Sequence, residues 1–156
     1  MHRRPPLSGG AAAALTLAAL AGCSATKAEV EPAPDAGSPA CVAALRQAPA
    51  HVLGQARIPL AVAGAAAWGR PPVVLRCGLP EPGPSTLPCL TVNGTDWVVD
   101  DRRDPLVFLT FGRSPAVEVR VPASYGRAEA PAALVDLAPV ADVLSRTARS
   151  CVGAAG

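Results

Sequence analysis

The stretch CLTVNGTDWVVD, residues 89–100, decides the fold. Its Asn-Gly pair stands between two runs rich in β-branched and aromatic residues, which is a strong signal for a two-residue type I′ turn. The stretch therefore predicts a β-hairpin in which Leu90 lies opposite Trp97. Alternation along its strands assigns one set of side chains to the core: Leu90, Val92, Trp97 and Val99. The other face receives Cys89, Asp96 and Val98.

Further strands are expected around this hairpin. Val73–Cys77 and Leu106–Phe111 are short apolar runs of strand length. Ala116–Val121 alternates, which places its three valines inward and Glu118 and Arg120 outward. Pro122 ends that strand.

Helical patterns lie nearer the two ends of the chain. Cys41–Ala48 carries apolar residues at helical spacing, and Pro139 suits the first turn of a terminal helix reaching about Arg149. Ala61–Ala67 predicts a helical turn, and 132–137 fits either helix or strand. The expected fold is α+β: a single small domain with an antiparallel sheet packed with N- and C-terminal helices and two disulfides.

The N-terminus has the three parts of a secretory signal over residues 1–22. Arg3 and Arg4 precede an apolar run that is too short to span a bilayer, which takes roughly 20 residues. The run ends in Leu-Ala-Gly-Cys, the pattern of a bacterial lipobox. The pattern predicts cleavage before Cys23 and a lipid anchor on its sulfur, so we expect a cell-membrane location on the extracytoplasmic face. The sequence leaves the export route open between Sec and twin-arginine.

The composition of the mature chain indicates three segments and argues against one class of partner. Residues 23–39 are expected to form a lipidated tether with little to bury, residues 40–151 the globular domain, and residues 152–156 a tail. Without Arg3 and Arg4 the basic and acidic residues balance, which argues against nucleic acid as a partner.

Four cysteines remain after Cys23, and an even number in an exported chain predicts two disulfides. Four cysteines allow three pairings. We favour Cys41–Cys151, which would join the domain's ends, with Cys77–Cys89 across the proline-rich loop. A zinc site is disfavoured because no two cysteines are closely spaced and the mature chain has one histidine, His51. We expect no metal and no cofactor.

Candidate catalytic groups are sparse. His51 is the only histidine for acid–base work in the mature chain, and no Gly-x-Ser-x-Gly motif accompanies it. Four aspartates stand close together, but arginines neutralise them in part and the calcium-loop spacing is absent. These four are Asp96, Asp100, Asp101 and Asp104. We expect these aspartates to lie in solvent at the end of the hairpin. The sequence therefore assigns no catalytic residue.

Three residues are candidates for contact with a ligand or partner. Trp68, beside Gly69 and two prolines, could stack on a sugar or a peptide. Arg76 and Arg113 could hold a carboxylate or phosphate through two hydrogen bonds. The alternative for these arginines is an internal pair with a carboxylate that orders the turns.

Three segments together resemble an actinobacterial lipoprotein family, catalogued as domain of unknown function 3515. They are WGRPPVVLRCG at 68–78, VNGTDW at 92–97 and FGRSPAVEV at 111–119. The resemblance covers most of residues 40–151 and implies a Gram-positive envelope address. It transfers no catalytic residue.

The leading hypothesis is a non-enzymatic, membrane-anchored envelope lipoprotein that binds an envelope protein or a cell-wall component. One alternative is a small cell-wall-acting hydrolase or transferase with His51 or an aspartate as base. Another is a carrier of a lipid or small ligand. The sequence does not choose the partner or the oligomeric state.

Overall fold

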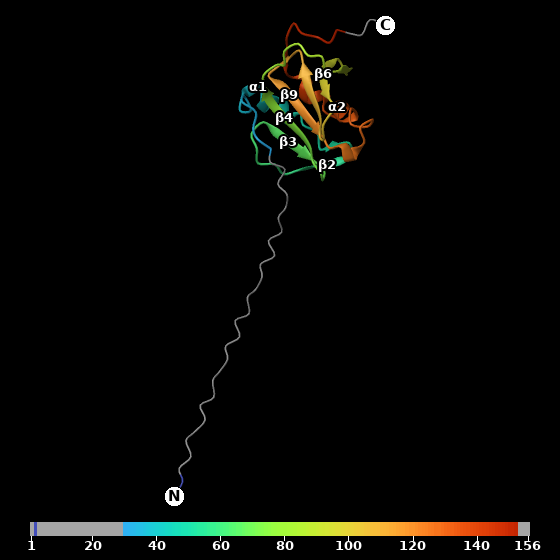
Figure 1. Ribbon diagram of the computed structural model, residues 1–156. Coiled ribbons are helices and arrows are strands. Elements are labelled where there is room, and N and C mark those ends of the chain that lie inside the picture. Colours follow the sequence, from blue (N-terminus) through green and yellow to red (C-terminus); the bar gives the residue numbers. More distant parts are fainter. Residues whose placement is uncertain (1, 3–29, 153–156) are drawn as a thin grey trace.

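The computed structural model describes residue 2 and residues 30–152, and the packed part is one α+β domain (Figure 1). Its centre is an antiparallel eight-stranded sheet of order β1-β2-β3-β4-β9-β7-β6-β5. The strands of this sheet are β1 His51–Val52, β2 Gln55–Ile58, β3 Ala65–Trp68, β4 Val73–Leu79, β5 Cys89–Val92, β6 Thr95–Asp100, β7 Leu106–Phe111 and β9 Ala116–Val121. The remaining elements are α1 Pro39–Arg46, α2 Ala132–Asp136, α3 Ala138–Asp142, the 3-10 turn η1 Ala123–Tyr125, and the paired short strands β8 Arg113–Ser114 and β10 Ser145–Arg146.

The predicted hairpin is confirmed as β5 and β6. Leu90 lies opposite Trp97 and Val92 opposite Thr95. Asn93 and Gly94 have positive φ angles of 48° and 75°, as a type I′ turn requires of both central residues. The sheet therefore has a turn end, where Asn93-Gly94 lies, and an opposite end, where β6 finishes at Asp100.

One face of the sheet, called here the helix-covered face, packs against the helices. α1 contacts β4 and α3 contacts β6. Trp68, Trp97 and Phe108 fill this core together with small aliphatic side chains. The inward valines of β9 were predicted correctly: Val117, Val119 and Val121 are fully buried.

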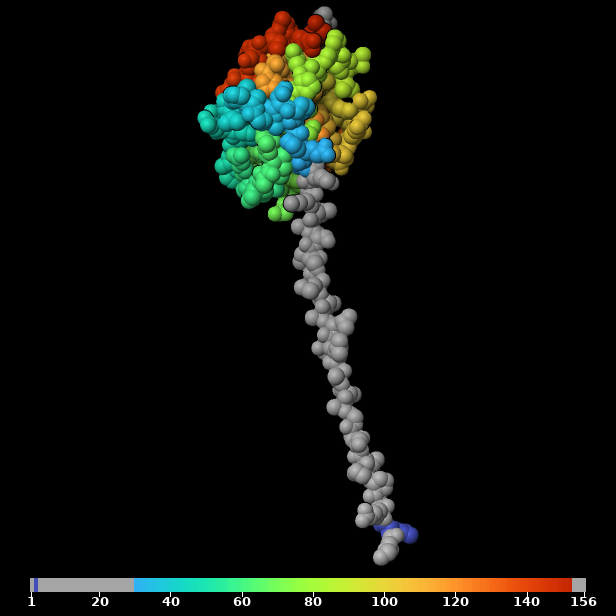
Figure 2. All heavy atoms as spheres, turned by 90° about the vertical axis from the view of Figure 1, so that its left-hand side faces the viewer, coloured from blue at the N-terminus to red at the C-terminus, as the bar shows by residue number. Residues whose placement is uncertain are grey.

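The other side of the sheet, the outer face, is covered by chain that was expected to be tether. Ala33 and Ala36 are buried, and the Asp35 amide donates to the Gly78 carbonyl at 2.9 Å. Figure 2 shows this segment, in blue, on the outside of the domain. Glu118, expected to face outward, is consequently only 8% exposed. Residues 33–36, which were expected to belong to the tether, therefore pack against the sheet.

Two disulfides form as expected, but their pairing differs from the prediction. Cys41 bonds to Cys77 and Cys89 to Cys151. Cys41 on α1 sits over β4, where Cys77 points into the core, so these two meet. Cys151 instead reaches edge strand β5, because the C-terminal residues cross from Gly112, which follows β7, to Asp96 of β6. The spacing of the cysteines in the sequence predicts neither of these two contacts.

Two helix predictions are wrong, each because a tertiary contact prevails. The alanine-rich stretch forms β3, since pairing of residues 65–68 with β4 outweighs the helix propensity of alanine. α3 ends at Asp142 rather than near residue 149. The Leu144 carbonyl accepts a hydrogen bond from Arg113 Nη1 at 2.9 Å, and the next residues pair with β8 as β10. The ambiguous stretch 132–137 is resolved as helix α2.

Candidate functional site

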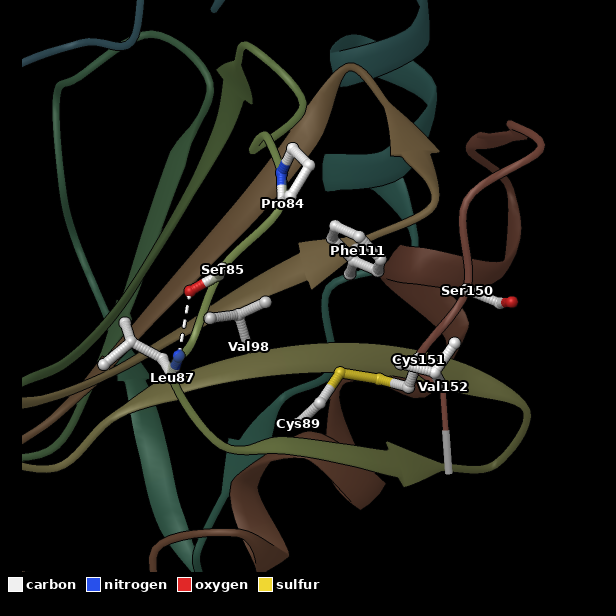
Figure 3. Close-up of a pocket in the computed structure, with 9 residues that line it drawn as sticks. All are labelled: Pro84, Ser85, Leu87, Cys89, Val98, Phe111, Ser150, Cys151 and Val152. Carbon is white, nitrogen blue, oxygen red and sulfur yellow. Dashed lines mark hydrogen bonds between the residues drawn. A yellow bond between two sulfur atoms is a disulfide. The ribbon is translucent and has the colours of Figure 1, made fainter. Parts of the chain in front are cut away.

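A hollow of about 370 Å³ lies on the outer face beside the Cys89–Cys151 disulfide (Figure 3). Val98 of β6 and Phe111 of β7 come from the sheet, and Pro84 to Leu87 come from the proline-rich loop. Its wall is mainly apolar side chains together with the disulfide. The full lining is Pro84, Ser85, Leu87, Cys89, Val98, Phe111, Ser150, Cys151 and Val152.

The C-terminal residues 147–152, called here the strap, form one wall of this hollow. The Thr147 amide donates to the Gly112 carbonyl at 3.0 Å, and the Cys151 amide donates to Asp96 Oδ2 at 2.7 Å. A side chain on Gly112 would collide with the Arg149 carbonyl, so glycine permits this close approach. The strap is therefore held by a few polar contacts and one disulfide.

A second, polar hollow of about 210 Å³ adjoins the first and shares Phe111 and Ser150 with it. Its remaining lining lies around the turn end of the sheet and along the strap. Three arginines and one aspartate give it its charge. These residues are Gly94, Asp96, Gly112, Arg113, Arg146, Thr147, Ala148 and Arg149.

Arg113 is the buried member of this group, at 3% exposure. Its guanidinium donates to the Leu144 carbonyl and to Thr95 Oγ1, both at 2.9 Å, and lies 3.6 Å from Asp142 Oδ1. Burial lowers the pKa of Arg113 from its ordinary value, and the nearby Arg146 lowers it further. Arginine stays protonated in proteins, so the charge remains in the hollow.

Trp68 does not lie where its proposed role requires. It is fully buried, and its Nε1 donates to the Pro49 carbonyl at 2.9 Å. A buried Trp68 cannot stack on a sugar or a peptide at the surface, so the structure does not support this candidate contact. Pairing of β3 with β4 turns this side chain into the core, because Trp68 lies opposite Val73 on the helix-covered face.

Arg76 forms an internal ion pair with a carboxylate, which was the alternative to ligand binding. Its Nε and Nη2 both approach Glu118 Oε1, at 3.0 and 2.9 Å, and Nη1 donates to the Glu31 carbonyl at 3.1 Å. Arg120 Nε donates to the same Glu118 oxygen at 2.7 Å. The cluster ties β4, β9 and the N-terminal segment together.

The other candidate groups are spread over the molecule. His51 is exposed on β1, at one edge of the sheet, while the hollow lies toward the β5 edge. Asp100 accepts two hydrogen bonds from the Arg102 side chain, and Asp104 Oδ1 accepts from the Ala123 amide. Among the described residues, no group of three or more His, Cys, Asp or Glu could hold a metal ion. The same residues contain no helix long and apolar enough to cross a membrane.

Sequence reasoning missed the strap and the hollow that it borders. Val98 and Phe111 carried a signal, since both faces of β7 are largely apolar, Val98 of β6 lies opposite Leu109 on the outer face, and an apolar outer face needs a cover. The cover comes from distant segments, the proline-rich loop and the C-terminal residues. No local pattern in the sequence connects those segments.

The fold and site define a small α+β domain, cross-linked by two disulfides, with an apolar hollow beside a cationic one. The chain belongs to a family of proteins of unknown function (DUF3515), whose model matches residues 8–148. No curated protein and no solved structure matches the chain.

Proposed function

We propose that this protein is an exported lipoprotein, anchored through Cys23, whose domain acts as a non-enzymatic binding module at the envelope. The observation that carries the proposal is the pairing of cysteines. The four cysteines downstream form two disulfides, which leaves Cys23 of five as the thiol for another purpose. It stands directly after Leu20-Ala21-Gly22, in the lipobox pattern.

The disulfides also support a location outside the cytosol. Stable disulfides belong to oxidising compartments outside the cytosol. The apolar run before Cys23 fits a signal peptide, and cleavage there would leave the lipid as the membrane link. A Gram-positive envelope, which the family resemblance suggests, is consistent with this arrangement.

The binding role rests on how the polar groups are used. Arg76 and Asp100 are engaged in internal ion pairs, and His51 lies away from the serines that line the hollow. A nucleophile needs a base within about 3 Å. The described residues offer a hollow with recognition chemistry rather than such a pair, which favours binding.

The anchor would also orient the domain. Val30 lies beside Pro72 and Pro105 at the opposite end of the sheet, away from the turn end that carries the polar hollow. Figure 1 shows the C-terminal residues, in red, at the other end of the domain from the segment in light blue that begins at residue 30. Six residues lie between Cys23 and Val30, and the seven steps from one to the other reach at most about 25 Å. The hollow would then face away from the membrane, toward an envelope protein or a cell-wall component.

The carrier role is a second candidate because the larger hollow, at about 370 Å³, falls in the size range of small-ligand sites. A carrier would retain its ligand through purification. Native mass spectrometry of the freshly purified protein would detect such a ligand as added mass.

The anchor is tested by expressing the full chain with an alkyne-tagged palmitate, beside a Cys23→Ala variant. The expected result is label on the wild-type protein alone, with the variant released from the membrane. In-cell crosslinking of both forms then tests the binding role, with a defined partner that depends on the anchor expected. Equal labelling of both forms would refute the anchor. Capture of no partner by anchored protein would refute the module.

A further inference from the structure

The apolar and cationic hollows meet at Phe111 and Ser150, so together they form one elongated site of mixed chemistry. Apolar side chains and the disulfide line one half. Three arginines line the other half. A ligand that fills both halves needs an apolar part joined to an anionic head.

We propose that this combined site binds a carboxylate carried on an apolar chain. The head would lie among Arg113, Arg146 and Arg149, and the chain would lie against Val98 and Phe111. The inference deepens the proposed binding role by naming its ligand class. It does not depend on the lipid anchor.

The cationic half is fixed in place by the fold. Thr95 and the Leu144 carbonyl hold the guanidinium of Arg113 from the helix side, using two of its five N–H donors. Arg149 Nη1 donates to the Pro82 carbonyl, which places that side chain against the proline-rich loop. Arg146 is exposed on β10 and lines the same hollow. A carboxylate suits planar guanidinium donors because two parallel hydrogen bonds can form.

Three carboxylates oppose an anion here, and each has other partners. Glu81 accepts from Thr147 Oγ1 at 2.5 Å, beside the polar hollow. Asp96 accepts from Thr91 Oγ1 at 2.6 Å and from the Cys151 amide at 2.7 Å. Asp142 faces Arg113 at 3.6 Å but is half exposed, so solvent screens it. The lining therefore keeps an excess of positive charge.

The apolar half supplies the specificity for a chain. Val98 and Phe111 border the same space as the Cys89–Cys151 disulfide, and Leu87 borders it from the proline-rich loop (Figure 3). Each methylene removed from water strengthens binding of the chain. A bare head such as acetate lacks this contribution, and a neutral alcohol lacks the arginine contacts.

The test is an NMR titration of the full chain carrying Cys23→Ala, which keeps acyl groups of the anchor out of the experiment. The probes are octanoate, octanol and acetate, with N-acetylleucine to distinguish a free acyl ligand from an apolar peptide terminus. Saturable shifts at Val98 and Phe111 are expected with octanoate or N-acetylleucine. Octanol and acetate are each expected to bind at least about tenfold more weakly.

Arg146→Gln should weaken binding of the carboxylate probe about tenfold without changing octanol. Arg57→Gln, an exposed arginine of strand β2, is the matched control and should change nothing. Octanol binding as tightly as octanoate would overturn the proposal. So would the absence of saturable shifts, or an equal loss in both variants. Such a failure leaves acylation of Cys23 untouched, so the two proposals fail separately.

Discussion

The helix-covered face and the outer face of the sheet are each closed by a disulfide, but in different ways. Cys41 and Cys77 are fully buried and belong to the core cluster. Cys89 is exposed, and its partner Cys151 belongs to the strap, whose backbone makes few hydrogen bonds. The same bond thus contributes to a packed core on one side and fastens a surface segment on the other.

Removing each disulfide in turn gives the largest test of this comparison. The chain-entropy estimate is about 4 kcal/mol for either loop, with sequence separations of 36 and 62 residues. Cys41→Ala with Cys77→Ala also removes buried sulfurs, so its loss of unfolding free energy should be the greater. Cys89→Ala with Cys151→Ala should keep the core packed and free the strap. Denaturant unfolding measures the first effect, and amide exchange at residues 147–152 measures the second.

Mild reduction supplies an independent check on the same contrast. A thiol reductant should open Cys89–Cys151 while the native protein keeps Cys41–Cys77 protected. Alkylation followed by peptide mass mapping identifies which thiols appear first. Simultaneous release of all four would show that the outer disulfide is as protected as the inner one, and the comparison would fail.

The next largest effect concerns the charged cluster under the N-terminal segment. Glu118→Gln leaves Arg76 and Arg120 facing each other without a carboxylate. Breaking a mostly buried ion pair costs about 3 kcal/mol, and the Arg76 and Glu118 side chains are 13% and 10% exposed. Chemical denaturation should detect this loss. Glu129→Gln, at an exposed position, is the control and should stay within about 0.5 kcal/mol of wild type.

A loss of unfolding free energy close to zero in Glu118→Gln would mean that water reaches the charged cluster on the outer face despite the segment that covers it. The segment at residues 31–36 would then contribute little to the sheet. Amide exchange at Asp35, which donates to Gly78, distinguishes these cases. Protection of that amide should fall in the variant if the cluster holds the segment down.

The two tryptophans sharpen the comparison within the helix-covered face. Both are fully buried, but Trp68 Nε1 donates to Pro49, whereas Trp97 Nε1 has no acceptor among the described residues. Phenylalanine at either position removes similar volume, so Trp68→Phe should cost about 1 kcal/mol more than Trp97→Phe. Unfolding midpoints of the two variants measure this difference. Equal losses would show that Trp97 has an acceptor such as bound water.

The elements that the sequence predicted well are those whose signal is local. The hairpin at residues 89–100 and strands β7 and β9 follow from turn chemistry and alternation, and their bounds agree with the expectation. β3 and the early end of α3 depended on a partner strand and on Arg113, both distant in sequence. Local propensity favoured helix in each case and lost to these contacts.

The candidate site was harder to predict for the same reason. Arg113 was singled out as a candidate contact residue, and it lines the polar hollow. Trp68 was singled out for its neighbours, yet strand pairing turns it inward. The hollow itself joins β6, β7, the proline-rich loop and the strap, and the Cys89–Cys151 disulfide that links two of these segments is part of its lining.

The smallest expected effect lies at the rim of the outer face, where Asp100 meets Arg102. The hydrogen bond from the Arg102 side chain lowers the pKa of Asp100 from 3.8 to about 2. Because the carboxyl pKa is lower in the folded state, the ionised carboxylate stabilises the fold at any pH above about 4. This stabilisation is lost as the pH falls from about 4 to about 2. Arg102 is two-thirds exposed, so solvent screens the pair and the unfolding midpoint at neutral pH should hardly change in Arg102→Gln. The NMR titration of Asp100 in that variant should instead move back toward 3.8. A titration that stays near 2 in this variant would assign the low pKa to the backbone amide of residue 102, 3.2 Å from Asp100 Oδ1, and to Arg103, whose Nε lies 3.9 Å from Asp100 Oδ2.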